Sequence, residues 1–192
     1  KIDMKKKLFP DDYLYLNDTL CVAKIIEPIG NNDYKPSVAR WNMATGEINP
    51  MPYEYPDLKK VRFIYTASAE HQLYVQCYTQ YDLMTICDFN GNLKCNIYGP
   101  KWVNEKTQTQ HYSLGVEFCG DKILALYSGG DHRTDAYYPT KFLVFDLNGN
   151  YLKTLETGYM ITDFCYDKEN NRLIINLNDE IQFAYLDLEG II

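Results

Sequence analysis

One short polar segment of the sequence brings together residues that could carry out chemistry. Asp131, His132 and Asp135 lie within Gly129-Gly-Asp-His-Arg-Thr-Asp135, and two carboxylates beside an imidazole could hold a cation or act as acid and base. Their spacing matches no known set of metal ligands, and short polar clusters of this kind are usually solvated turns. The sequence also lacks a GxSxG elbow, an HExxH motif and a glycine-rich phosphate loop. We therefore expect no catalytic residue, no metal and no cofactor; the alternative is a metal-assisted hydrolase or lyase with its site in residues 128–140.

Aromatic and basic side chains are the stronger candidates for binding. Tyrosine, tryptophan and arginine are enriched at binding hot spots, and long loops on a rigid scaffold commonly carry function. Tyrosine is also frequent in this chain, at 18 of 192 residues, so any one ring could instead pack between sheets with its hydroxyl group in solvent. For the loops as a group we favour ligand recognition, and the candidate ligand-binding residues are Tyr34, Trp102, His111, Tyr112, His132, Arg133, Tyr137 and Tyr138.

The charge balance restricts the class of partner. Nineteen Lys and Arg residues against 26 Asp and Glu residues give a formal net charge of −7. A nucleic acid or an anionic membrane surface needs a basic patch that displaces counterions from phosphate, and the basic run is Lys5-Lys-Lys7 alone. No apolar run approaches the roughly 18 to 20 residues that span a bilayer. We therefore expect no nucleic-acid partner and no membrane-spanning segment, and a protein, peptide or glycan ligand.

The six cysteines are expected to be thiols rather than three disulfides. Five of them lie inside strand-like apolar runs, where a free thiol behaves as a small apolar side chain. No Cys-x-x-Cys pair is present, which argues against a zinc site. We expect buried thiols at Cys21, Cys77, Cys87, Cys119 and Cys165.

The elements that must position these residues are short strands. The clearest signal is a β-hairpin at residues 141–155, where two apolar runs flank Asn148-Gly149, a pair that readily takes the positive φ angles of a two-residue turn. Similar turns end at Gly46, Gly91 and Gly190, so the turn glycines are 45, 58 and 41 residues apart. No segment shows a sustained 3.6-residue apolar period. The pattern predicts an all-β chain with a repeating four-stranded antiparallel unit.

Four-stranded repeats of roughly 40 to 50 residues are typical of β-propellers. We expect one β-propeller domain over residues 1–192, with about four blades near 10–56, 60–99, 113–157 and 160–192, and with residues 1–9 as a closing strand if the ring is complete. A β-sandwich also gives many short strands, but it does not explain why the same turn recurs at every fourth connection. Three arrangements stay open: a four-bladed ring, an open arc, and the C-terminal two thirds of a six-bladed protein.

Strand direction alone separates two kinds of connection in such a blade. The turns within the first and the last strand pairs emerge on one side and are short. The links between the middle strands, and between one blade and the next, emerge on the other side, in residues 29–36, 51–60, 101–112 and 128–140. All the candidate ligand-binding residues lie in these longer segments. We therefore expect a non-enzymatic recognition or scaffold domain that binds its ligand on the loop-rich side.

The turn signature also resembles that of a known family. A strand, Asp, two residues and Gly occur in Phe145-Asp-Leu-Asn-Gly149, Cys87-Asp-Phe-Asn-Gly91 and Leu186-Asp-Leu-Glu-Gly190, and this is similar to TolB-like and NHL-like six-bladed β-propellers. Trp41-Asn-Met-Ala-Thr-Gly46 departs from the pattern because it lacks the Asp. The resemblance covers most of the chain and implies six blades and a periplasmic or cell-surface lipoprotein. Lys1 is not a natural start residue, so we expect further sequence upstream, and the compartment stays open.

Overall fold

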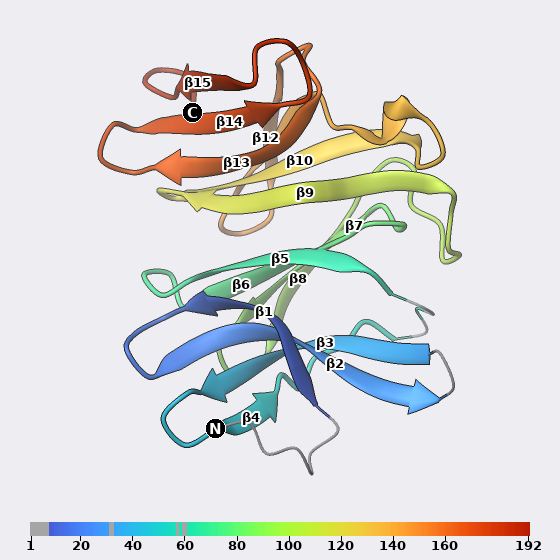
Figure 1. Cartoon of the computed structure of the whole chain (residues 1–192), viewed down its shortest axis with the longest axis vertical. Coiled ribbons are helices and arrows are strands. Elements are labelled where there is room, and N and C mark those ends of the chain that lie inside the picture. The colour runs from blue at the N-terminus through green and yellow to red at the C-terminus, as the bar shows by residue number, and fades with distance from the viewer. Residues whose placement is uncertain (1–7, 31–32, 57, 59–60) are drawn as a thin grey trace.

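The structure, a computed structural model, describes residues 8–30, 33–56, 58 and 61–192, which form four antiparallel sheets (Figure 1). The first sheet contains β1 (Phe9–Tyr15), β2 (Leu20–Gly30), β3 (Asp33–Asn42) and β4 (Glu47–Pro50). The second contains β5 (Phe63–Ser68), β6 (Leu73–Tyr78), β7 (Leu83–Asp88) and β8 (Leu93–Tyr98). The third contains β9 (Thr109–Cys119), β10 (Lys122–Asp131), β11 (Lys141–Asp146) and β12 (Tyr151–Glu156), with the 3-10 helix η1 (Asp135–Tyr137) between β10 and β11. The fourth contains β13 (Ile161–Asp167), β14 (Arg172–Leu177) and β15 (Phe183–Asp187).

The prediction of an all-β fold built of four-stranded antiparallel units is confirmed, and the fourth unit has three strands. The sheets follow one another in sequence order, with the first and the fourth at opposite ends of the long axis (Figure 1). In the described part of the chain they form an open, partial propeller. Most of the expected closing strand, residues 1–7, lies outside the described residues, and Phe9 begins β1, where it pairs with Ile26. No helix in the described ranges is long and apolar enough to cross a membrane.

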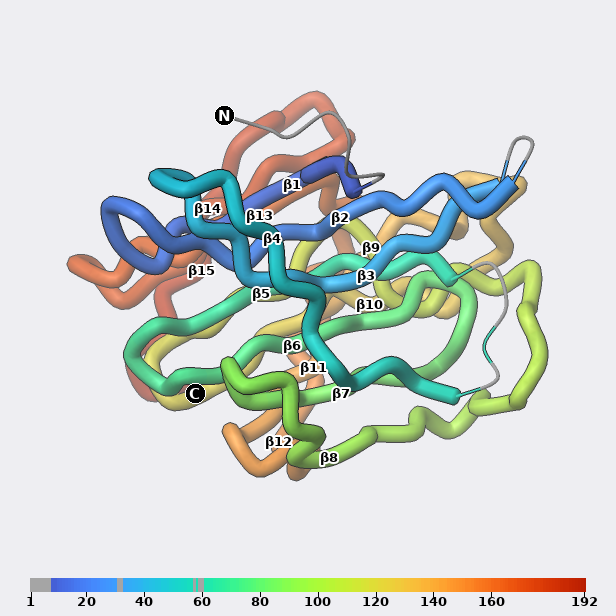
Figure 2. Tube along the Cα trace, turned by 90° about the horizontal axis from the view of Figure 1, so that it is seen from below, coloured from blue at the N-terminus to red at the C-terminus, as the bar shows by residue number. Residues whose placement is uncertain are grey.

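The hydrophobic core lies between consecutive sheets. Along β6, Tyr74 and Tyr78 belong to the cluster shared with the first sheet, whereas Leu73, Val75 and Cys77 belong to the cluster shared with the third. Side chains alternate in direction along a strand, so a strand covered on both faces has apolar residues at nearly every position. All six residues of β6 are buried, and the tube view shows the second sheet between its neighbours (Figure 2).

The fourth sheet packs against the third through one face. Leu173 and Ile175 of β14 share a buried cluster with Leu124 of the third sheet. The opposite face of the fourth sheet carries Phe183 and Tyr185, whose exposed fractions are 69% and 67%. One face of the fourth sheet is therefore buried and the other is exposed, whereas both faces of the second sheet are buried.

The two sides of the array carry different connections (Figure 1). Short turns lie on one side, whereas the longer segments 51–62, 99–108 and 132–140 lie on the other. Strands extend into three of the predicted loops and shorten them. Only residues 31–32 lie between β2 and β3, β9 begins at Thr109, and β10 continues to Asp131. Tyr34, His111 and Tyr112 are therefore strand residues, and their expected placement in loops is wrong.

The recurring glycine turn is held by the acidic residue that ends the preceding strand. The Asp146 carboxylate accepts hydrogen bonds from the backbone N–H groups of Asn148 and Asn150, at 2.9 Å each. The Asp146 N–H in turn donates to the Asn150 carbonyl oxygen at 3.0 Å, which leaves three residues in the loop. Only its last residue, Gly149, has a positive φ, of 86°. The expected two-residue Asn-Gly turn is therefore wrong, and the loop is a three-residue hairpin that ends in a left-handed glycine.

The same turn recurs at Asp88, and the first sheet has a longer turn that an amide oxygen holds in a related way. Asp88 accepts from the N–H groups of Asn90 and Asn92 at 2.8 and 2.9 Å, and hydrogen bonds from Asn92 hold the pKa of the Asp88 carboxyl below its usual value. In the first sheet the side-chain oxygen of Asn42 accepts from the N–H groups of Ala44 and Thr45, at 3.0 and 3.1 Å. An amide oxygen therefore replaces the carboxylate in the segment that lacks the Asp.

A valine at position 149 tests the turn. Gly149 has φ of 86°, and an added Cβ would lie 2.7 Å from Cys95 Sγ, whereas Gly158 has φ of 74° with open space around it. Valine is strained at such a φ, so we expect Gly149→Val to lower the free energy of unfolding by roughly 1 to 3 kcal/mol. Gly158→Val, which lacks the close contact, should cost less. Urea denaturation measures both, and equal losses would contradict the close contact.

The cysteines are free thiols, and four of them are buried: Cys21, Cys77, Cys87 and Cys119. Burial raises the pKa of the Cys87 thiol to about 11 and also raises that of Cys77. Cys165 is exposed, so its expected burial is wrong. It lies on β13 and points to the uncovered face of the fourth sheet, because its neighbour Phe164 points into the cluster with the third sheet.

Thiol labelling distinguishes these environments. A thiol reacts as its thiolate, so burial and a raised pKa slow the reaction. We expect one fast-reacting thiol in the native protein with a disulfide reagent such as DTNB, and we expect Cys165→Ser to remove it. Half-buried Cys95 should follow more slowly, and the other four should react only on unfolding. Several fast thiols in the Cys165→Ser variant would contradict the sheet assignment.

Candidate functional site

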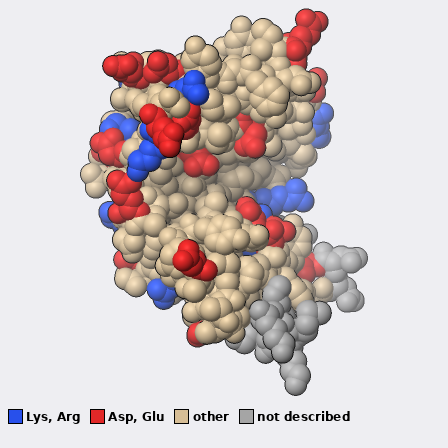
Figure 3. Space-filling model, turned by 60° about the vertical axis from the view of Figure 1, so that its left-hand side comes forward, with Lys and Arg blue, Asp and Glu red and all other residues tan. Residues whose placement is uncertain are grey.

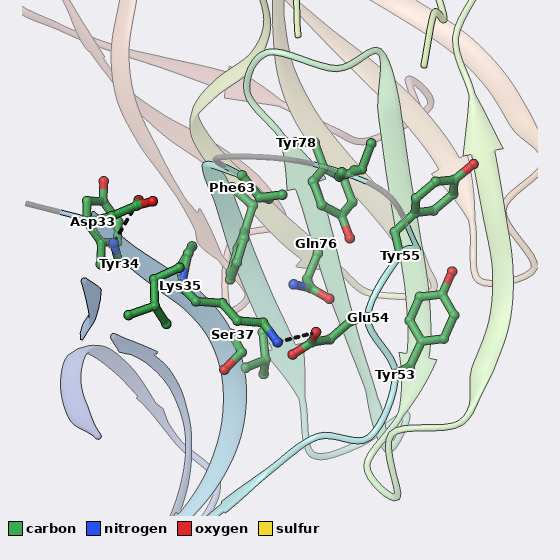
Figure 4. Close-up of a pocket in the computed structure, with 15 residues that line it drawn as sticks. Asp33, Tyr34, Lys35, Ser37, Tyr53, Glu54, Tyr55, Phe63, Gln76 and Tyr78 are labelled. Carbon is green, nitrogen blue, oxygen red and sulfur yellow. Dashed lines mark hydrogen bonds and ion pairs between the residues drawn. The ribbon is translucent and has the colours of Figure 1, made fainter. Parts of the chain in front are cut away.

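A cleft of about 380 Å³ lies between the first and the second sheets, on the side of the longer connections (Figure 4). One wall is the start of β3, the other is the segment that follows β4, and the floor comes from β5 and β6. Its volume falls in the range of roughly 300 to 1,000 Å³ that is common for small-molecule sites. The side chains labelled around it are Asp33, Tyr34, Lys35, Ser37, Tyr53, Glu54, Tyr55, Phe63, Gln76 and Tyr78.

An ion pair joins the two walls. Lys35 Nζ on β3 lies 2.6 Å from Glu54 Oε2 in the segment after β4, and Figure 4 shows the two side chains meeting across the cleft. Both side chains are about half exposed, so the pair contributes little to stability. The pair instead fixes the distance between β3 and the segment after β4 at this point of the cleft.

Aromatic contacts hold the second wall in place. The Tyr53 hydroxyl accepts a hydrogen bond from Asn96 Nδ2 on β8 at 2.9 Å, and burial raises the pKa of this tyrosine. The Tyr55 ring lies 5.7 Å from Trp102 and 6.4 Å from Tyr98, in edge-on geometry. The wall is therefore backed by the second sheet and by the 99–108 segment.

The floor of the cleft contains one buried polar side chain among aromatic rings. Gln76 on β6 is 6% exposed, and Figure 4 shows its amide pointing into the cleft beside Phe63 and Tyr78. In the described part of the chain the Gln76 amide has no hydrogen-bond partner. The amide opens to the cleft and is not among the polar atoms that are fully buried without a partner, so it is accessible to a ligand.

The sequence-predicted residues do not converge on one site. Tyr34 lines the cleft, and Trp102 lies behind it through its contact with Tyr55. His132, Arg133, Tyr137 and Tyr138 belong to a different connection, between β10 and β11 of the third sheet. The remaining two candidates, His111 and Tyr112, are interior residues of β9, each about 1% exposed.

His111 belongs to a buried polar network. Its Nδ1 lies 3.3 Å from the Tyr127 hydroxyl, which donates to Asp82 Oδ2 at 3.3 Å. The same carboxylate oxygen accepts from the backbone N–H of Lys101 at 2.9 Å. On its other side His111 Nε2 lies 3.4 Å from Thr107 Oγ1. The network ties both ends of the 99–108 segment to Asp82, directly before β7, and to Tyr127 on β10. His111 therefore helps to hold this segment in place.

The β10–β11 connection is ordered by an internal ion pair. Arg133 donates to the Asp131 carboxylate from Nε at 3.0 Å and from Nη2 at 2.6 Å, and these bonds hold the pKa of the Asp131 carboxyl well below its usual range. His132 Nδ1 lies 2.9 Å from the Gln108 carbonyl oxygen. Among the described residues no three His, Cys, Asp or Glu side chains gather as metal ligands. Asp131 and His132 are thus engaged within the fold, and Asp135 begins η1.

The molecule also has a second cavity, apart from the lining of the cleft, and a face of mixed charge. A second cavity of about 370 Å³, between the second and the third sheets, is lined by Tyr98, Tyr127 and Lys141, and Lys141 Nζ lies 5.8 Å from the centre of the Tyr127 ring. On the face in Figure 3, acidic and basic side chains lie in small separate groups, without an extended basic area. Elsewhere in the chain, Lys168 Nζ lies 3.0 Å from Glu70 Oε2.

Several cleft residues were absent from the sequence prediction. Tyr53 and Tyr55 stand in one of the longer segments and carry the aromatic signal that selected Tyr34. Gln76 interrupts the otherwise apolar or aromatic run Leu73–Tyr78, and a polar residue inside a strand buried on both faces is a usable signal. Lys35 and Glu54 have no such signal, because their pairing depends on two segments that meet only in the fold.

Acidification tests the position of His111. Burial lowers its pKa against the opposing effect of Asp82, so below about pH 6.5 the unfolded chain takes up a proton that the folded chain does not. The contribution of His111 to stability is therefore present above pH 6.5 and is lost as the pH falls through the folded pKa. We expect urea denaturation at pH 7.5 and 5.5 to show a larger loss in the wild type than in His111→Gln.

The matched control is His71→Gln, since His71 lies in the short turn on the opposite side, with its Nε2 2.8 Å from the Gly120 carbonyl oxygen. Comparison with this variant separates the loss of the buried network from the loss of any histidine. Parallel curves for the wild type and for His111→Gln would contradict the buried, neutral histidine.

Comparisons with known proteins support the fold and give no family. No family model matches the sequence, and no curated protein matches it. Solved structures do match: a chain of a nidogen/laminin complex is similar with a TM-score of 0.56 and 11% identity over 88% of this chain and 57% of that one. BamB from Moraxella catarrhalis gives a TM-score of 0.55 and 14% identity over 90% of this chain and 41% of its own.

A member of the DUF4221 family from Bacteroides vulgatus is similar with a TM-score of 0.56 and 14% identity, over 91% of this chain and 63% of that one. The chain thus spans about two fifths to two thirds of the length of these three structures. At such identities the likeness concerns the fold alone. The chain has a β-propeller-like fold, which agrees with its four radially ordered antiparallel sheets.

Proposed function

We propose that this chain is a recognition module whose ligand is a protein, a peptide or a glycan, bound on the side of the longer connections and centred on the cleft between the first two sheets. The observation that carries the proposal is Gln76, a largely buried side chain whose amide opens into an aromatic cleft and has no hydrogen-bond partner among the described residues. Ligand sites commonly combine apolar and aromatic walls with a few well-placed polar groups. The cleft has this composition.

The likeness to solved propellers is compatible with binding. One similar chain comes from a structure that is itself a complex, of nidogen with laminin. Rigid sheets that present longer connections on one side suit such a role, because a fixed scaffold lowers the entropy lost on binding. The six-bladed, TolB-like or NHL-like assignment is part of the proposal, supported by the Asp88 and Asp146 turns.

The geometry gives less support to the alternative of a metal-assisted hydrolase or lyase in residues 128–140. Asp131 is engaged by Arg133 from two nitrogen atoms, and His132 is directed to a backbone carbonyl group. The stacked rings of Tyr137 and Tyr138, 4.2 Å apart, instead offer this connection as a second contact area for a large ligand.

A screen followed by point variants tests the proposal. The purified chain is applied to arrays of oligosaccharides, of peptides and of extracellular proteins, and the strongest ligand is measured by titration. We expect Tyr34→Ala to weaken binding by about tenfold or more, which is the loss of one well-packed aromatic contact. Tyr34 is 43% exposed, so its removal should leave the melting temperature nearly unchanged.

The matched control is Tyr185→Ala, which removes a more exposed tyrosine, at 67% against 43% for Tyr34, from β15 in the fourth sheet. It should bind as the wild type does. Equal binding by both variants and the wild type would place the ligand elsewhere and reject the cleft as the site.

A further inference from the structure

We propose that the cleft between the first two sheets takes a neutral saccharide, and that it does not extend the first sheet by a peptide strand. This inference rests on the proposed function, because it names the ligand class of the same cleft. It follows from the hydrogen-bonding groups that β3 presents there, from the aromatic walls and from the local charge.

The edge of β3 that lines the cleft is not covered by β4. The pairing of β3 with β4 runs only from Ala39 to Asn42, while β3 begins at Asp33. The Val38 carbonyl oxygen accepts from the Met51 N–H at 2.8 Å, so Val38 directs its backbone groups to this edge. Backbone groups alternate in direction along a strand, and Tyr34 and Pro36 therefore direct theirs to the same edge.

This exposed edge offers more acceptors than donors, because among the backbone groups of Tyr34, Pro36 and Val38 the Val38 N–H is the one donor without a hydrogen-bond partner in the described part of the chain. Pro36 has no N–H group, and the N–H of Tyr34 already donates to Asp33 Oδ1 at 3.0 Å. A peptide that adds as a β-strand needs both donors and acceptors from the edge, and proline is one of the residues that protects sheet edges from such pairing. The two carbonyl oxygens instead suit a ligand rich in donors, such as hydroxyl groups.

The walls and the floor suit the remaining surfaces of a sugar. Aromatic faces carry negative charge density, which attracts the C–H groups on one face of a pyranose ring, and Tyr34, Tyr55 and Phe63 line the cleft. At the floor the Gln76 amide supplies two donors and an acceptor. Adjacent hydroxyl groups of a saccharide each donate and accept, so they can satisfy an amide that no protein group satisfies.

The charges around the cleft favour a neutral ligand. Among the described residues that line the cleft, Lys35 is the one cation, and its ammonium group is paired with Glu54 at 2.6 Å. Asp33 is the remaining charged group of the lining. No unpaired cation of the described lining is available for a phosphate, sulfate or uronate group, and desolvating such an anion without a partner is costly.

The test uses an array of neutral and acidic oligosaccharides together with a set of extended decapeptides, followed by calorimetric titration of the best probe. The key variant is Gln76→Met, which keeps the size of the side chain and removes the amide. We expect neutral oligosaccharides to bind, and this variant to lose about tenfold or more in affinity, because one to two hydrogen bonds disappear. Its melting temperature should be nearly unchanged, since the amide opens to the cleft and makes no hydrogen bond to a described residue.

Two further variants separate the outcomes. Gln182→Met makes the same change at an exposed position between β14 and β15, and Pro36→Val restores an N–H group to the β3 edge. Gln182→Met should keep saccharide affinity, and Pro36→Val should not gain affinity for extended peptides. Peptide binding that strengthens in Pro36→Val would overturn the saccharide inference and leave the proposed recognition role standing. Preference for acidic oligosaccharides would overturn the inferred neutral ligand. Absence of any probe binding that responds to Gln76→Met or Tyr34→Ala would overturn both.

Discussion

Each sheet of this chain is stabilised by burial against the next one, and the remaining features follow from that constraint. Tyr74 and Val75 are consecutive on β6, yet they belong to different cores, one on each side of the second sheet. Such packing fixes the order of the sheets and directs all the connections to two opposite sides. The cleft arises between the first and the second sheets, where β3 and the segment after β4 form its walls.

The fold was predictable because its signals are local. An acidic residue is followed three positions later by a left-handed glycine at Gly91, Gly149 and Gly190. Apolar runs such as Leu73–Tyr78 mark strands that are buried on both faces. The details of the turn were not predictable, since Asn148-Gly149 is compatible with both two-residue and three-residue loops. The hydrogen bonds of Asp146 decide in favour of the longer one.

The site was less predictable because it depends on which residues meet. His111 and Tyr112 follow a long connection in the sequence, but β9 begins before them and places both in the interior. Tyr34 was found through its aromatic character. The Gln76 amide and the Lys35–Glu54 pair, which form the cleft together with Tyr34, come from separate segments. Gln76 stands out in the sequence because it interrupts an apolar run, but the residues that its amide faces are set only by the packing of the two sheets.

The one-sided packing of the fourth sheet has a consequence for the dynamics of the chain. In a linear array each unit is held by its neighbours. The fourth sheet packs its apolar side chains against the third sheet, and Phe183 and Tyr185 are exposed on its other face. Local opening free energies follow the amount of buried apolar contact. In the 192-residue chain, amide protons of β14 and β15 should therefore exchange with solvent deuterium sooner than those of β6.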